Sequence, residues 1–166
     1  NGLDCYKVGP TLGCGTSALM DGDAIVYPYC WKEYEILENG PLRFTVKLTY
    51  NPLTVAGNEG VVETRIISLA KGSQLNKTVV SYAGLTKAAP VATGLVIHPE
   101  NPTAYVLEGD KGYIAYADLT DNVNNGNGII YVGAVMPAKV QEAKAQMCAD
   151  KEAKERGASR PVPAIS

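Results

Sequence analysis

The stretch that decides the fold reads Leu42-Arg-Phe-Thr-Val-Lys-Leu-Thr-Tyr50. Apolar and polar residues alternate through all nine positions. Successive side chains of a β-strand point to opposite faces of its sheet, so this alternation predicts a strand with one buried face. The preceding turn, Glu38-Asn-Gly-Pro41, favours a hairpin, because Asn and Gly tolerate positive φ and Pro restricts the backbone. We therefore expect residues 30–37 to be the antiparallel partner strand.

The same pattern continues on both sides of this hairpin. Turn residues at 51–52, 57–60 and 71–73 separate two further alternating or apolar segments, 61–69 and 75–82. In the second half, we expect strands at 91–98, 104–107, 112–117 and 129–135. The Asn- and Gly-rich run at 118–128 predicts a loop. Short connections between successive strands indicate an all-β, mainly antiparallel fold.

The pattern changes at Pro137. Residues 138–156 are rich in Ala, Lys, Glu and Gln, and Gly157 follows them, which predicts one helix. Its apolar stripe is thin (Val140, Ala143 and Met147), as is typical of a helix on the solvated rim of a domain. We thus expect a β-sandwich or supersandwich body over residues 1–136 and a C-terminal helical insertion with a loop over 137–166.

Composition excludes several classes of function. A net charge of −2 over 166 residues gives no electrostatic reason to expect nucleic acid or an anionic membrane as partner. No apolar run approaches the ~20 residues of a membrane-spanning helix. The chain has one histidine, His98, and lacks both a C-x-x-C pair and a phosphate-binding loop, so we expect no metal and no cofactor. Cys5, Cys14 and Cys30 allow one local disulfide or are buried thiols.

Two strands carry polar groups in patterns that suggest a binding cleft. On 61–69, Glu63 and Arg65 share a face that is otherwise apolar; the alternative is an ordinary ion pair on a solvated sheet. On 30–37, two-residue spacing places Trp31, Glu33 and Glu35 on one face. A ring beside a carboxylate suits sugar recognition, and the alternative is a packing Trp beside solvated glutamates. A pair of carboxylates can also hydrolyse a glycosidic bond, so Glu35 and Glu63 are candidate catalytic residues. Trp31 and Arg65 are candidate substrate-binding residues.

His98 stands at the end of an apolar strand and precedes Pro99. Histidine is the side chain that ordinarily titrates near neutral pH, so His98 is a candidate general acid or base. If the reaction is an epimerisation or an elimination, we expect His98 and a carboxylate to share the proton transfers. A purely structural histidine at a strand end is the alternative.

Several short segments, in this order, resemble a bacterial family known as a domain of unknown function. They are Gly2-Leu-Asp-Cys-Tyr-Lys-Val-Gly9, Leu12-Gly-Cys-Gly-Thr-Ser-Ala-Leu19, Glu38-Asn-Gly-Pro-Leu-Arg43, Thr64-Arg-Ile-Ile-Ser-Leu69 and Val91-Ala-Thr-Gly-Leu-Val-Ile-His98. Members of this family are often encoded beside polysaccharide-degrading enzymes. The Gly-Pro-Leu-Arg turn and the Thr-Arg strand are also similar to galactose-mutarotase-like domains. This second resemblance implies a twisted supersandwich with a concave sheet where sugars bind.

The resemblance implies a carbohydrate-associated protein of the periplasm or cell exterior. Its partners would be plant-type acidic oligosaccharides or polysaccharides, and the activity would be that of a glycoside hydrolase, lyase or epimerase. Arg65 would hold an acidic sugar and Trp31 would stack on it. A non-catalytic carbohydrate-binding or accessory structural domain is the alternative, because such folds host both enzymes and binders. The resemblance also implies that a remainder of the domain packs against this chain.

Overall fold

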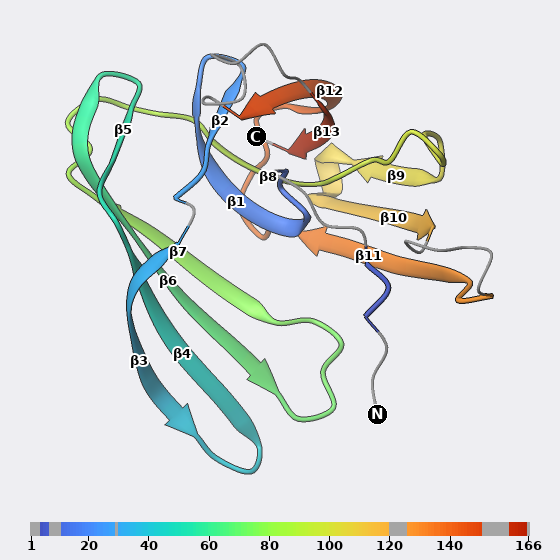
Figure 1. Cartoon of the computed structure of the whole chain (residues 1–166), viewed down its shortest axis with the longest axis horizontal. Helices are drawn as coiled ribbons and strands as arrows, with labels where there is room; N and C mark the ends of the chain where they lie inside the picture. Colours follow the sequence, from blue (N-terminus) through green and yellow to red (C-terminus); the bar gives the residue numbers. More distant parts are fainter. Residues whose placement is uncertain (1–3, 7–10, 29, 120–125, 151–159, 166) are drawn as a thin grey trace. The chain divides into compact units, whose positions relative to one another are not determined.

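The computed structural model describes residues 4–6, 11–28, 30–119, 126–150 and 160–165 (Figure 1). Nearly all strand pairs are antiparallel, and the short pairing of β2 with β12 is parallel. Contacts divide the chain into two units, one formed by Asn1–Val26 with Pro90–Ser166 and the other by Tyr27–Ala89. The described residues contain no helix long and apolar enough to cross a lipid bilayer. The prediction of a mainly antiparallel all-β fold is confirmed.

The unit Tyr27–Ala89 is a meander of twisted strands, seen as the long arrows of Figure 1. Its sheet has the order β3-β4-β6-β5, and β7 also pairs with β6. The bounds are β3 (Trp31–Asn39), β4 (Arg43–Tyr50), β5 (Leu53–Val55), β6 (Asn58–Ala70) and β7 (Lys77–Ala83). The predicted hairpin is present: β3 and β4 are antiparallel, and the N–H of Gly40 donates to the carbonyl of Arg43 across the turn. Two bulges interrupt β3, one between Trp31 and Glu33 and one between Ile36 and Glu38.

The stretch 42–50 forms β4 from Arg43 onward, and its apolar residues occupy one face as predicted. Tyr50 is buried, and Val46 and Leu48 are half-buried. Leu42 and Phe44, beside the β3–β4 turn, are exposed. Burial of this face is therefore confined to the end of the hairpin far from the turn.

The other unit contains two sheets. In the first, five strands close on themselves in the order β1-β2-β12-β13-β8. They are β1 (Cys14–Asp21), β2 (Ala24–Val26), β8 (Val91–Leu95), β12 (Ala143–Asp150) and β13 (Arg160–Ile165). The second has the order β11-β10-β9, and its strands are β9 (Tyr105–Glu108), β10 (Tyr113–Leu119) and β11 (Ile129–Val135). A 3-10 turn, η1 (Gly109–Lys111), joins β9 to β10. The core holds Leu95, Ile97, Ile114 and Tyr116.

The predicted C-terminal helical insertion is wrong for the described residues, because Ala143–Asp150 forms strand β12. β12 pairs with β13 along six residues and with β2 at its end. These ladders satisfy the backbone groups of an Ala-rich segment, so its tertiary partners override the intrinsic helix propensity. Residues 151–156 of the predicted helix lie outside the described residues.

Asn58 joins three segments of the Tyr27–Ala89 unit. Its side chain is buried, and Nδ2 donates to the carbonyls of Val55 (3.1 Å) and Lys87 (3.2 Å). Oδ1 accepts from the backbone N–H groups of Thr86 and Lys87, each at 2.8 Å. One amide thus pairs the backbone of the β5–β6 turn with the segment that follows β7.

Asn58→Ala is expected to lower the free energy of unfolding by roughly 3 kcal/mol, because one buried and three partly buried hydrogen bonds to the backbone are lost and each contributes about 0.5–1.5 kcal/mol. Chemical denaturation measures this change. Asn51→Ala is the control, since the exposed Asn51 makes a long bond of 3.4 Å to the carbonyl of Cys30. A loss at Asn58 no larger than the loss at Asn51 would contradict this structural role.

Candidate functional site

A histidine and an aspartate form the centre of the candidate site, in the unit that contains Pro90–Ser166. His98 Nδ1 lies 2.8 Å from Asp118 Oδ1, and the side chains are 12% and 1% exposed respectively. Within the described part of the chain, His98 Nε2 has no hydrogen-bond partner. An imidazole held through Nδ1 by a carboxylate presents Nε2 for proton exchange. The arrangement is suited to general acid–base chemistry.

Strand β10 places Asp118 by simple alternation. Ile114, Tyr116 and Asp118 are all buried, two residues apart on one face of the strand. The sequence prediction ended this strand at residue 117 and assigned Asp118 to the following loop, so it missed the partner of His98. The signal was present: a carboxylate continues a buried apolar face, a position that normally requires a polar partner.

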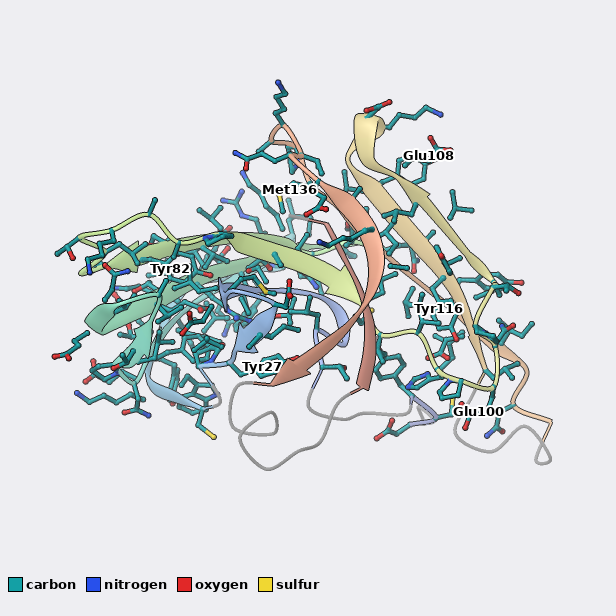
Figure 2. The ribbon with its side chains drawn as sticks, turned by 90° about the horizontal axis from the view of Figure 1, so that it is seen from above. Tyr27, Tyr82, Glu100, Glu108, Tyr116 and Met136 are labelled. Atoms are coloured by element: carbon teal, nitrogen blue, oxygen red, sulfur yellow. The ribbon has the colours of Figure 1, made fainter. Side chains whose placement is uncertain are left out.

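The hydroxyl of Tyr116 and the side chain of Asn101 join β10 to the segment after β8, where Figure 2 labels Tyr116 and Glu100. The N–H of His98 donates to the Tyr116 hydroxyl at 3.2 Å, and that hydroxyl donates to the carbonyl of Asn101 at 3.0 Å. Asn101 Nδ2 donates to the carbonyl of Ala117 at 2.7 Å. The backbone around His98 is thereby bonded to the strand that carries Asp118.

Two tyrosine hydroxyls and one thiol interact electrostatically with Asp118. Burial, and then the charge of Asp118, raise the pKa of Tyr116 above its ordinary value. Burial also raises the pKa values of Tyr6 and Cys14, again with a contribution from Asp118. All three groups therefore keep their protons at neutral pH. The Tyr6 hydroxyl and Asp118 Oδ2 are buried and have no hydrogen-bond partner in the described residues.

Glu63 and Arg65 lie in the Tyr27–Ala89 unit, on one face of β6 as the sequence predicted. Arg65 Nε donates to Glu63 Oε1, and the guanidinium carbon lies 5.0 Å from the centre of the Tyr50 ring. Glu63 is 1% exposed and Arg65 is 13% exposed. Burial raises the pKa of Glu63 and outweighs the opposing effects of Arg65 and Tyr82. These features describe a buried ion pair packed on an aromatic ring.

Trp31 and Glu35 do not share a face, because the bulge between Trp31 and Glu33 shifts the register of β3. Trp31 is opposite Tyr50, on the face of Glu63 and Arg65, and makes an edge-to-face contact with Tyr34 at 5.5 Å. Glu35 is opposite Lys47 on the other face and forms an exposed ion pair with it at 3.5 Å. Glu35 and Glu63 therefore point to opposite sides of one sheet.

No group of three or more His, Cys, Asp or Glu residues that could hold a metal ion occurs in the described ranges. Cys5, Cys14 and Cys30 are free thiols. The side chain of Cys148 lies outside the described part of the chain.

The buried ion pair yields a stability prediction. Arg65→Met is expected to lower the free energy of unfolding by about 3–5 kcal/mol, because it leaves the Glu63 carboxylate buried without its cation. The matched control is Lys47→Met, which breaks the exposed Glu35 pair and should cost less than ~1 kcal/mol. Urea denaturation of both variants measures the difference, and equal losses would refute the assignment of Arg65 to a buried structural pair.

The chain is similar to known proteins. It belongs to the family described as Domain of unknown function (DUF4861), whose model matches residues 1–159. The chain is also similar to "Uncharacterized protein P7" of Formosa agariphila, with 27% identity over 115 residues. That match covers 69% of this chain and 28% of the relative's length. No solved structure matches the chain.

Proposed function

We propose that this domain acts on carbohydrate by proton transfer, with His98 as the proton carrier and Asp118 as the group that orients it. The observation that carries the proposal is the 2.8 Å contact between His98 Nδ1 and Asp118 Oδ1. The contact fixes the ring and directs Nε2 away from the carboxylate, as general acid–base catalysis requires. The resemblance of the Gly-Pro-Leu-Arg turn and the Thr-Arg strand to galactose-mutarotase-like domains supports carbohydrate as the substrate class.

Two reactions suit a single oriented imidazole. In an elimination on a uronate-containing chain, Nε2 takes the proton from the carbon beside the sugar carboxylate. The released electron pair forms a carbon–carbon double bond, the carbon–oxygen bond to the leaving sugar breaks, and the leaving oxygen takes up a proton from the protonated imidazole or from water. In an epimerisation, Nε2 takes the same proton, and water on the opposite face of the carbon supplies the proton that replaces it. Both reactions balance without an oxidant or reductant.

The geometry supports these reactions better than hydrolysis by Glu35 and Glu63. A hydrolytic pair must flank one bond, with carboxyl groups about 5–9.5 Å apart in a common space. Glu35 and Glu63 project from opposite faces of the sheet, and each is paired with a cation. The sandwich or supersandwich arrangement, the acidic plant-type polysaccharide and the periplasmic or extracellular location belong to the same proposal and derive from the sequence resemblance.

His98→Ala is expected to lower turnover at least ~100-fold, the usual contribution of an oriented acid–base group, while oligosaccharide affinity changes less than about threefold. The substrates are uronate-containing oligosaccharides in deuterated water. Ultraviolet absorbance detects the unsaturated product of elimination, and NMR detects deuterium incorporated by proton exchange. Lys111→Ala, an exposed site on η1, is the control. The proposal fails if the native domain neither forms product nor incorporates deuterium.

A second candidate function is carbohydrate binding without catalysis. It is supported by the aromatic face of the β3–β4–β6 sheet, where Trp31 and Tyr34 are each more than half exposed and in edge-to-face contact. Exposed rings on a sheet offer stacking surfaces to the apolar faces of sugars. The opposite face of the sheet carries Glu35 and Lys47. No aromatic ring occupies the positions of β3 and β4 that pair on that face.

For this candidate, Trp31→Ala should weaken oligosaccharide binding about tenfold, equivalent to ~1.4 kcal/mol, because one stacking ring is lost. Titration calorimetry gives the affinity, and circular dichroism checks that the sheet is retained. Tyr131→Ala removes a more exposed ring on β11 and serves as the control. Unchanged affinity in Trp31→Ala would exclude this face as the sugar-binding surface.

A further inference from the structure

The position of His98 depends on a turn that the strand pairing does not fix. β8 ends at Leu95, three residues before His98, so the imidazole lies beyond the ladder that holds the strand. Within the turn, the N–H of Asn101 donates to the carbonyl of His98 at 3.1 Å. This bond closes residues 98–101 into a turn but does not attach the turn to β10, where Asp118 lies.

The hydroxyl of Tyr116 makes that attachment at both ends of the turn. It accepts from the N–H of His98 and donates to the carbonyl of Asn101. Tyr116 is two residues from Asp118 on the same face of β10, so the group that holds the turn and the group that bonds the imidazole come from one rigid strand. The distance between His98 and Asp118 is thus set within a single short stretch of β10.

Tyr116 is well suited to this task. Its ring is 2% exposed and packs in the core with Leu95, Ile97 and Ile114, which prevents the hydroxyl from moving. The hydroxyl must be protonated to donate to Asn101 while it accepts from His98, and its raised pKa keeps it so at neutral pH. Small displacements of an acid–base group are costly, since a shift of about 1 Å can lower a rate ~100-fold.

We propose that Tyr116 is a positioning residue, whose hydroxyl holds the 98–101 turn so that His98 meets Asp118. The catalytic part of this inference rests on the proposed role of His98, and the structural part does not. Tyr116 acts through its two hydrogen bonds to the turn and does not need to touch a substrate.

Tyr116→Phe removes the hydroxyl and keeps the ring. His98 is the one histidine of the sequence, so the ¹⁵N NMR spectrum of its imidazole can be read without ambiguity. At a pH where the ring is neutral, the native domain should show the Nδ1–H tautomer that the Asp118 bond requires. Tyr116→Phe should show a mixture of tautomers, with loss of the slowly exchanging Nδ1 proton. Tyr131→Phe, 80% exposed on β11, should match the native spectrum.

Where turnover is measurable, kcat of Tyr116→Phe should fall roughly 10- to 100-fold while KM stays within about threefold. The reason is that the His98 imidazole is misplaced while the substrate-binding site is kept. A native tautomer in folded Tyr116→Phe would overturn the proposal. If this variant does not fold, Asn101→Ala decides, since it loosens the same turn by removing the bond to Ala117. A tautomer mixture there supports the proposal and a native spectrum overturns it. If the native domain is inactive, the proposed function fails while the tautomer result still tests the positioning role.

Discussion

Strand alternation, which sends successive side chains to opposite faces of a sheet, is the constraint on which both candidate sites depend. On β10 it brings Ile114, Tyr116 and Asp118 to one buried face, so the core and the acid–base pair share a strand. On β3 and β6 it sends Glu35 and Glu63 to opposite faces. A shift of one residue in strand register moves a side chain to the other face of its sheet. The register therefore decides whether two groups can act together.

Two carboxylates of the domain are buried, and they differ in the side chain that pairs with each. Glu63 is paired with a guanidinium, which is charged at every accessible pH, and the pair packs against Tyr50. Asp118 is paired with an imidazole, which carries a second ring nitrogen that can give or take a proton. A pair whose cation keeps its proton and packs against an aromatic ring favours a structural role. An imidazole held through one ring nitrogen can carry a proton to another molecule through the other nitrogen.

The sequence predicted the antiparallel class and most strands of the Tyr27–Ala89 unit, because their alternation is strong and their turns are marked by Gly, Asn and Pro. It did not predict β12, because an Ala-rich segment becomes a strand through partners that are distant in sequence. The face-sharing of Glu63 and Arg65 was predictable from two-residue spacing. The bulge in β3 was not, so Trp31 and Glu35 were assigned to one face in error. His98 was identified by residue type, and its partner Asp118 was missed because the predicted strand ended at residue 117, two residues before the end of β10.

The two bulges of β3 also bear on how the domain behaves beside other copies of itself. β3 is the outer strand of its sheet and exposes unpaired backbone groups along one side. Each bulge breaks the regular spacing of those groups, and Lys32, Glu33 and Glu35 add charge along the same strand. A strand from a neighbouring chain therefore cannot form a continuous hydrogen-bond ladder with β3. The bulge that separates Trp31 and Glu35 onto opposite faces thus also protects the sheet against edge-to-edge aggregation.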